Sequence, residues 1–348
     1  MSLVLIPMSA SSVLNLNNLS FQRRPFTVHG IGIVLLLLSA TAWSTEALNA
    51  SQLMKRMTEA TEKLNYDGVF IYQRGAQIDS MRIVHKFDGQ EERERLVSLS
   101  GPEREVIRDG SRVTCLFADD REVMVEKSEP RDLLSLGLTE PIEHLTASYS
   151  FNLAGQDRVA GRLTTVVNIL PKERNRYSYQ LWIDNEFNLL LKSVTLNRSG
   201  QTLEQVQFVQ ITVSDDLPDT LFDTEIEGTG FTWYTNSNPD NTAATVVETS
   251  GWTVNWVPAG FQMRNHRVQK MSESDMPVSH IVYSDGLAMV SVFVEKLMDK
   301  SQSLQGFSSM GAVNAFSRVA DNYQITVVGE VPLPMVRKIA TSVEHQNQ

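Results

Sequence analysis

The clearest alternation of apolar and polar residues runs through "RYSYQLWIDNEFNLLLKSVTL", from Arg176 to Leu196. It predicts two extended segments joined by a turn at 184–186. Side chains alternate across a strand, so one face of the first segment carries Tyr177, Tyr179, Leu181 and Ile183. Trp182 points the other way, and the returning segment has leucines on both sides. An antiparallel sheet at a protein surface usually exposes one face to water. Apolar residues on both sides of these segments therefore indicate that both faces are covered.

The same period of two recurs from Tyr66 to Val213 in short segments separated by turn signals such as Asp88-Gly89 and Asp109-Gly110. A spacing of roughly ten residues per strand is typical of an antiparallel meander. A sheet with this many strands must twist and curl, which gives it a concave side. We therefore expect one large curved sheet in the first half of the chain.

Two segments interrupt the strands. Ser51 can cap a helix that ends near Asn65, with apolar residues at helical spacing. The segment "PRDLLSLGLTEPIEHL" (130–145) predicts a short helix or a leucine-rich loop. Both segments are natural plugs for the concave side of the sheet, and we expect Leu133 and Leu134 to take part.

A polar region rich in Pro, Gly, Asn and Asp follows the meander and indicates a linker at 219–249. It separates a first domain, 45–218, from a second, 250–348. The second domain begins at "GWTVNWVPAGF" and contains a hairpin signal at Asp285-Gly286. Near its end Pro334 suits the first turn of a helix. We expect a small α+β domain here.

The first 44 residues resemble a targeting segment. Arg23 and Arg24 precede the short apolar run "IGIVLLLLSA" (31–40), and small residues follow. Ten apolar residues are too few to span a bilayer, so we expect a cleavable secretory signal. Cleavage is expected after Ala42, with Ser44 as the alternative, and the mature protein is then extracytoplasmic.

Composition narrows the partners. The chain has 348 residues, 42% of them hydrophobic and 21% charged, with a net charge of −10. This is an ordinary globular composition. An acidic protein is a poor match for nucleic acid, because binding to phosphates needs a basic surface.

No pattern of catalytic or metal-binding residues stands out. "GFSSMG" lacks the second glycine of a nucleophile elbow at Met310, and the histidines lack His or Cys neighbours at ligand spacing. Cys115 is the only cysteine, so an intramolecular disulfide is excluded. We expect no cofactor, no metal and no enzymatic activity.

Aromatic residues on strands offer a binding surface instead. Most of them are expected to build the two cores, but some can line an apolar cleft under the curled sheet, the usual form of a lipid or small-molecule site. The candidates for such a lipid pocket are Tyr177, Tyr179, Trp182, Leu190, Leu133 and Leu134. The candidates for binding a protein partner are Trp252, Trp256 and Tyr283.

Several long strings resemble one family. "VAGRLTTVVNILPK", "RYSYQLWID" and "GQTLEQVQFVQITV" are similar to the N-terminal domain of the RseB/MucB family, periplasmic regulators of the envelope-stress sigma factor. "GWTVNWVPAGF", "DMPVSHIVYSDGLAMVSVFV" and "ITVVGEVPLP" resemble its C-terminal domain. The resemblance covers essentially all of the chain after the targeting segment, in the same order.

The resemblance implies a fold and a function. The N-terminal domain of the family is similar to the LolA/LolB lipoprotein carriers, so the expected fold is α+β. A curved antiparallel half-open β-barrel with helical plugs is followed by a smaller α+β domain. The implied function is to bind the periplasmic domain of a membrane anti-sigma factor and protect it from regulated proteolysis.

In the family, lipopolysaccharide or acylated lipoprotein is implied as the signal that relieves this block. A homo-oligomer is a further possibility. The alternative function is a periplasmic lipoprotein or lipid carrier of the LolA type, which the first domain alone would favour. An enzyme is the third alternative.

Overall fold

The structure, a computed structural model, describes residues 49–127, 138, 141–235, 251–270, 277–298 and 303–345. Residues Ala47–Gln348 cluster as one compact unit. Within the described residues the chain is mostly β, with a large sheet, a smaller sheet and a two-stranded ribbon.

The described residues form a 12-stranded sheet in the order β12-β6-β5-β4-β3-β2-β1-β11-β10-β9-β8-β7. Neighbouring strands pair antiparallel except β12 and β6, which are parallel. The strands are β1 (Tyr66–Arg74), β2 (Gln77–Phe87), β3 (Glu92–Ser98), β4 (Arg104–Asp109), β5 (Arg112–Phe117), β6 (Glu122–Lys127), β7 (Tyr149–Val159), β8 (Arg162–Pro171), β9 (Ser178–Asp184), β10 (Leu190–Leu196), β11 (Thr202–Val213) and β12 (Thr232–Thr235). The predicted meander is confirmed, and β11 returns to pair with β1.

The second sheet has six strands among the described residues, in the order β14-β15-β16-β19-β18-β17. Its strands are β14 (Gln262–Lys270), β15 (Pro277–Ser284), β16 (Met289–Lys296), β17 (Gly306–Met310), β18 (Val313–Ala320) and β19 (Tyr323–Gly329). The ribbon pairs β13 (Trp252–Val254) with β20 (Val343–His345). Helix α3 (Leu333–Thr341) packs on β18 and β19 and has Pro334 in its first turn, as predicted.

The expected α+β class needs correction, because helices are few. In the described part of the chain the α-helices are α1 (Ala50–Lys63), α2 (Ile142–Leu145) and α3. Among its described residues the leucine-rich insert contributes the single turn α2, and Leu133 and Leu134 lie outside the described residues. The long alternating segments dominate and make the fold mostly β.

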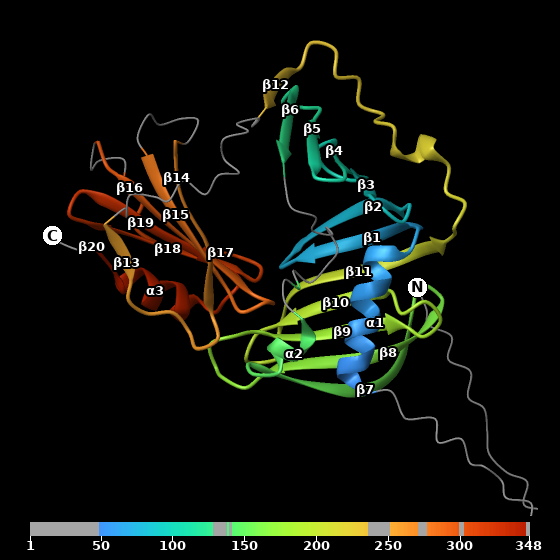
Figure 1. The fold of residues 1–348 in the computed structure, drawn as a ribbon, viewed down its shortest axis with the longest axis horizontal. Coiled ribbons are helices and arrows are strands. Elements are labelled where there is room, and N and C mark those ends of the chain that lie inside the picture. The colour runs from blue at the N-terminus through green and yellow to red at the C-terminus, as the bar shows by residue number, and fades with distance from the viewer. Residues whose placement is uncertain are drawn as a thin grey trace, which may run out of the picture. The chain divides into compact units, whose positions relative to one another are not determined.

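Helix α1 begins two residues earlier than the sequence suggested. Asn49, not Ser51, is the N-cap: its side chain accepts from the Gln52 backbone N–H, and the Gln52 side chain accepts in return from the Asn49 N–H. This capping box satisfies two donors at the helix start. Figure 1 shows α1 lying across the strands β1, β11, β10, β9 and β8.

The face of the sheet under α1 holds one apolar cluster. Leu53, Met54 and Met57 of α1 pack there with residues of β8 and β9 such as Leu181 and Ile183. Trp182, on the opposite face by alternation, belongs to another cluster with Val159, Val166 and Leu189. Both faces of β9 are therefore covered by the protein's own residues, as its sequence indicated.

The described part of the predicted linker, 219–235, packs against the large sheet. It contains the short helix η1 (Asp219–Phe222) and β12, and both Phe222 and Ile226 are buried. Residues 236–249 of the linker lie outside the described residues.

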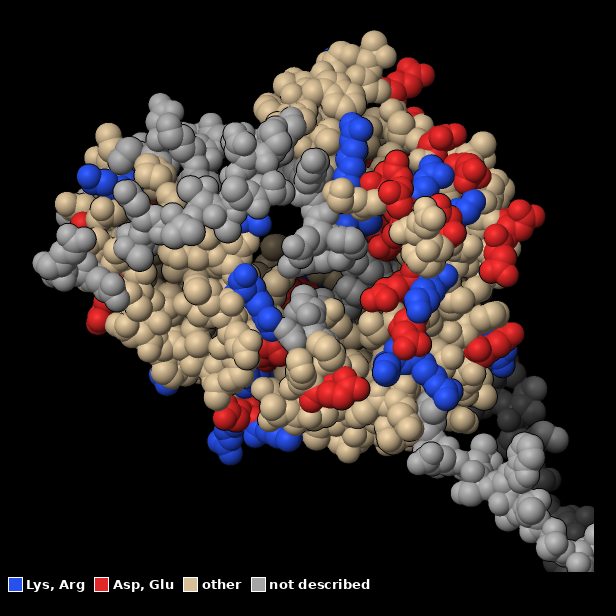
Figure 2. All heavy atoms as spheres, in the orientation of Figure 1, with Lys and Arg blue, Asp and Glu red and all other residues tan. Residues whose placement is uncertain are grey.

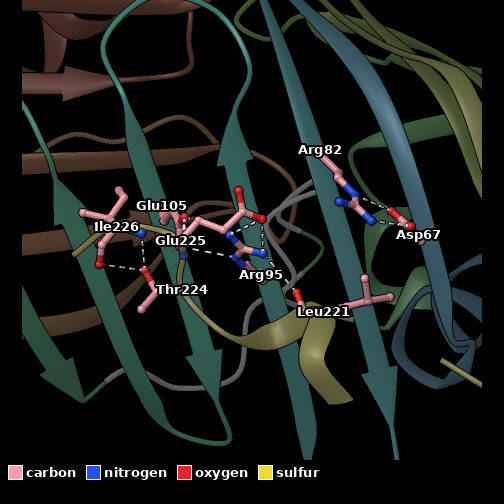
Figure 3. Close-up of polar contacts among 8 residues, drawn as sticks. All are labelled: Asp67, Arg82, Arg95, Glu105, Leu221, Thr224, Glu225 and Ile226. Carbon is pink, nitrogen blue, oxygen red and sulfur yellow. Dashed lines mark hydrogen bonds and ion pairs between the residues drawn. The ribbon is translucent and has the colours of Figure 1, made fainter. Parts of the chain in front are cut away.

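A buried arginine holds this segment down (Figure 3). Arg95 donates to Glu105 through Nη2 at 2.8 Å and through Nε at 3.3 Å, and it also donates to the Leu221 carbonyl at 3.2 Å. Glu105 accepts in turn from the Glu225 backbone N–H at 3.1 Å. One ion pair of β3 and β4 thus fixes two points of the 219–226 segment.

A buried histidine ties the end of α1 to the sheet. His85 on β2 is fully buried, with Nδ1 2.7 Å from the Leu64 carbonyl oxygen and Nε2 3.1 Å from Glu92 Oε1. Its ring stacks on Tyr66, with centroids 5.0 Å apart. The hydrogen bond with His85 holds the pKa of Glu92 below its usual range.

The surface charges are mixed. Figure 2 shows acidic and basic side chains interspersed over the part of this face formed by α1 and β1 to β3. The described residues on this part of the face thus form no continuous basic stripe of the kind that nucleic-acid binding would require.

We predict that Arg95→Ala lowers the free energy of unfolding by about 3–5 kcal/mol, because it leaves Glu105 buried without its cation. Arg82→Ala is the matched control. Its partner Asp67 is partly exposed, so the loss should be about 1 kcal/mol or less. Urea unfolding of both variants measures the difference, and equal losses would contradict the assignment of Arg95 as the buried anchor.

We predict that Glu92→Gln destabilises the protein at neutral pH and not in acid. A carboxyl whose folded pKa is lowered contributes stability above its unfolded pKa, ordinarily about 4.3, and this is lost as the pH falls through the folded pKa. Thermal unfolding from pH 7 to pH 3 should show the two midpoints converging. Glu91→Gln, at an exposed neighbouring position, is the control. A difference between the midpoints that does not shrink as the pH falls would contradict the prediction.

Candidate functional site

The smaller sheet contacts the large one through the tips of two hairpins. The β15–β16 tip carries Leu287, and the β17–β18 tip carries Ala312. Both side chains are buried in the same apolar cluster that α1 covers. We call the residues 285–288 and 311–314, with the groups that they contact on the large-sheet side, the hairpin-tip junction.

Asp285 is the central polar residue of this junction. Its Oδ2 accepts from Arg176 Nε at 2.5 Å and from the Tyr149 hydroxyl at 3.0 Å. Its Oδ1 accepts from the backbone N–H groups of Leu287 and Ala288 and so shapes the hairpin tip. The side chains of Asp285 and Arg176 are almost completely buried. A charge at this depth depends on its partner, because an unpaired buried charge is strongly unfavourable.

Arg176 has a second set of contacts with the smaller domain. It donates through Nη2 to the Ala259 carbonyl, and its guanidinium lies 5.1 Å from the centre of the Phe261 ring. Gly260, between them, has φ +86°, and a Cβ there would lie 2.6 Å from Ser148 Oγ. Only glycine allows the loop to approach this closely.

The second tip is held by neutral and acidic partners. Asn314 donates through Nδ2 to the Tyr177 hydroxyl and to the Val331 carbonyl, both at 2.8 Å. Glu204 on β11 accepts from the Ala312 backbone N–H at 3.0 Å. Together the two tips make four polar contacts with the large-sheet side, at the edge of one apolar cluster.

Burial keeps the tyrosines of the junction protonated. It raises the pKa of Tyr149, with further contributions from Tyr179 and Asp285, and it raises the pKa of Tyr177 and of Tyr179. The hydroxyls therefore remain available as donors throughout the physiological pH range.

The structure separates the six residues predicted for a lipid pocket. Tyr177, Tyr179 and Leu190 belong to the cluster under α1 and the hairpin tips. Trp182 lies on the other face of the sheet. Its Nε1 donates to Asp157 at 2.9 Å, and the Lys192 ammonium lies 4.5 Å from the centre of its ring. Leu133 and Leu134 lie outside the described residues.

The three residues predicted for partner binding all touch the core of the smaller domain. Trp252 is buried and packs edge-on against Tyr323, with ring centroids 4.9 Å apart. Trp256 and Tyr283 are partly buried against the same core. Their role in partner binding stays a prediction.

Sequence reasoning missed the polar residues of the junction. Asp285 was read only as a turn residue, although its carboxylate also pairs with Arg176, 109 positions away. Tyr149, Arg176 and Asn314 had no short motif around them. The only signal in the sequence was an aspartate between two apolar strands. That its charge is fully buried, which is unusual for aspartate, is seen only in the structure.

The described residues contain no group of three or more His, Cys, Asp or Glu side chains that could hold a metal ion. Among them, no helix is both long enough and apolar enough to cross a bilayer. In the described residues the junction is an apolar cluster with a polar, hydrogen-bonded edge.

Two parts of the chain match models of known protein families. Residues 49–226 match the model of the MucB/RseB N-terminal domain, and residues 246–344 match that of the MucB/RseB C-terminal domain. The sigma factor AlgU regulatory protein MucB of Pseudomonas aeruginosa is 30% identical, over 89% of this chain and 96% of its own. The sigma-E factor regulatory protein RseB of Haemophilus influenzae is 30% identical, over 89% of this chain and 95% of its own.

Solved structures agree. The crystal structure of MucB in complex with MucA(peri) matches with a TM-score of 0.68 at 28% identity, covering 86% of this chain and all of that one. The crystal structure of MucB alone matches with a TM-score of 0.59 at 28% identity, covering 85% of this chain and 98% of that one. Both of these sequence relatives are named as sigma-factor regulatory proteins. The chain belongs to the MucB/RseB family of sigma-factor regulators.

Proposed function

We propose that this protein is a periplasmic negative regulator of a sigma-E type envelope stress response. It binds the periplasmic domain of a membrane anti-sigma factor and shields that domain from regulated proteolysis. The observation that carries the proposal is the match, over both domains, to MucB in its complex with MucA(peri). The targeting segment at 1–44, which lies outside the described residues, supports export with cleavage between Ala42 and Ser44.

The large sheet serves as a half-open barrel of LolA type whose hollow face is filled by the protein itself. Helix α1 fills one part, and the two hairpin tips fill another through Leu287 and Ala312. Burying a leucine side chain contributes about 1.5–3 kcal/mol. Each methylene of an acyl chain contributes about 0.8 kcal/mol, so three or four methylenes suffice to compete with Leu287 for the same cluster.

The signal therefore acts by competition at the junction. An acyl chain of lipopolysaccharide or of a lipoprotein that enters beside Tyr177, Tyr179 and Leu190 replaces the hairpin tips. Displacement changes how the two domains are held together, and the anti-sigma factor, which needs both, is released. The linkage is reciprocal, with a coupling of about 1–3 kcal/mol, and bound partner would weaken lipid binding by the same factor.

We predict that the purified protein captures the anti-sigma periplasmic domain of the same organism and slows its cleavage by the site-1 protease. A pull-down and a time course of cleavage measure the two effects. Failure of both would reject the proposed function. Transfer of an acylated lipoprotein between membranes, with no effect on cleavage, would instead favour the alternative of a lipid carrier.

We predict that Asp285→Asn makes the complex more sensitive to lipid, because the neutral side chain leaves the buried Arg176 with only the exposed Glu173 carboxylate, 3.7 Å away, as a counter-charge. The lipopolysaccharide concentration that releases half of the partner should fall by about 5- to 150-fold. Glu186→Gln removes an ion pair with an exposed carboxylate, at the other end of β9 from Arg176, and is the control. An unchanged release concentration in Asp285→Asn, with the variant still folded, would contradict the junction mechanism.

A further inference from the structure

The smaller sheet has a second feature that the junction does not use, at the strand β17. Within the described residues β17 is the last strand of its sheet, so one of its edges has no neighbouring strand. All five of its residues are exposed, including Phe307 and Met310. A free edge with exposed apolar side chains is a template for pairing with another strand.

The geometry of the hairpin shows which backbone groups face outward. Gly311 has φ +62° in the two-residue loop between Met310 and Val313, which fits a tight hairpin turn. Met310 and Val313 are then the hydrogen-bonded closing pair. Since such pairs alternate along an antiparallel ladder, the N–H and C=O groups of Phe307 and Ser309 point to the free edge.

A groove lies beside this edge. It has a volume of about 330 Å³ and is lined by Phe307 of β17 and by one side of α3, comprising Leu333, Pro334, Arg337, Lys338 and Thr341. This volume is at the lower end of the range for ligand pockets, about 300–1,000 Å³. An edge strand with a neighbouring helix and a groove between them can bind an extended peptide by strand addition, with alternate side chains entering the groove.

The charge of the groove selects the peptide. Arg337 and Lys338 are exposed, and Lys338 Nζ lies 3.7 Å from the centre of the Trp256 ring. Among the described residues neither cation has a carboxylate within ion-pair distance. On a protein with a net charge of −10, two adjacent cations without acidic partners favour an acidic segment.

We propose that β17 and α3 bind an extended polypeptide segment by strand addition, with an apolar side chain in the groove and acidic residues at Arg337 and Lys338. The occupant is a segment of the anti-sigma periplasmic domain, so this inference rests on the proposed function. It gives Trp256 an indirect part, since the ring positions the Lys338 ammonium.

The test compares variants of the whole protein by fluorescence anisotropy with the labelled anti-sigma periplasmic domain. Ser309→Pro removes the outward N–H while leaving the β18 ladder intact, and edge strands tolerate proline at such positions. Ser309→Ala is its matched control, because both variants lose the hydroxyl that donates to Asn314. Ser309→Pro should raise Kd at least about tenfold relative to Ser309→Ala.

A second pair of variants tests the charges. Arg337→Gln with Lys338→Gln should raise Kd and weaken its dependence on salt. Lys55→Gln with Arg56→Gln, another adjacent pair of exposed cations on a helix, should change neither. Thermal unfolding checks that each variant is folded. If Ser309→Pro does not fold, the proposal is tested by the charge variants alone.

The outcomes separate the two proposals. If the unmodified protein does not bind the anti-sigma domain, both fail. If it binds and all variants bind with the same Kd, the proposal of a peptide groove is overturned and the proposed function stands. If the charge variants lose binding to phosphatidylglycerol vesicles but keep the anti-sigma domain, the groove is a lipid site and the inference is also overturned.

Discussion

The buried contact between Arg176 and Asp285 is the constraint on which the two-domain arrangement depends. Arg176 lies just before β9 of the large sheet, and Asp285 lies in a hairpin of the smaller sheet. The Tyr149 hydroxyl donates a further hydrogen bond to Asp285. A buried ion pair contributes little net stability, because desolvation offsets the attraction. Its effect is on specificity: a docking that misplaced either group would leave a charge buried alone. Burial of Leu287 and Ala312 at the tips favours contact between the two domains, and the ion pair fixes their relative position.

This division has a functional consequence. The tips complete the cluster that α1 covers, so in the proposed mechanism the contact between the domains is also the surface at which lipid competes. Few residues need to move for the surface to open, since each tip buries one small or medium side chain there. The large sheet itself is anchored separately, by Arg95 and Glu105 under the 219–226 segment and by His85 at the end of α1. Opening the junction therefore need not unfold the sheet.

The two sheets offer different kinds of surface. Apolar clusters of the protein's own residues cover both faces of the large sheet around β9. The exposed charges on the face seen in Figure 2 are mixed in sign. Among the described residues the smaller sheet has an unpaired edge at β17, with two cations nearby. A partner that engaged this edge would approach through the β17–β18 hairpin, whose tip already contacts Glu204 on β11. The hairpin thus connects the proposed peptide groove to the junction through continuous structure.

The sequence alone determined the local structure, because period-two alternation and turn residues act over a few positions. It predicted the meander, the hairpin at Asp285-Gly286, the helix with Pro334 in its first turn and a β9 strand covered on both faces. It placed the cap at Ser51 where Asn49 performs it, since two candidate caps two residues apart differ only in the contacts they make. Only the tertiary structure decided that Asp285 pairs with Arg176 and that Tyr177 meets Asn314, because these partners are more than 100 residues apart and no local pattern encodes their meeting.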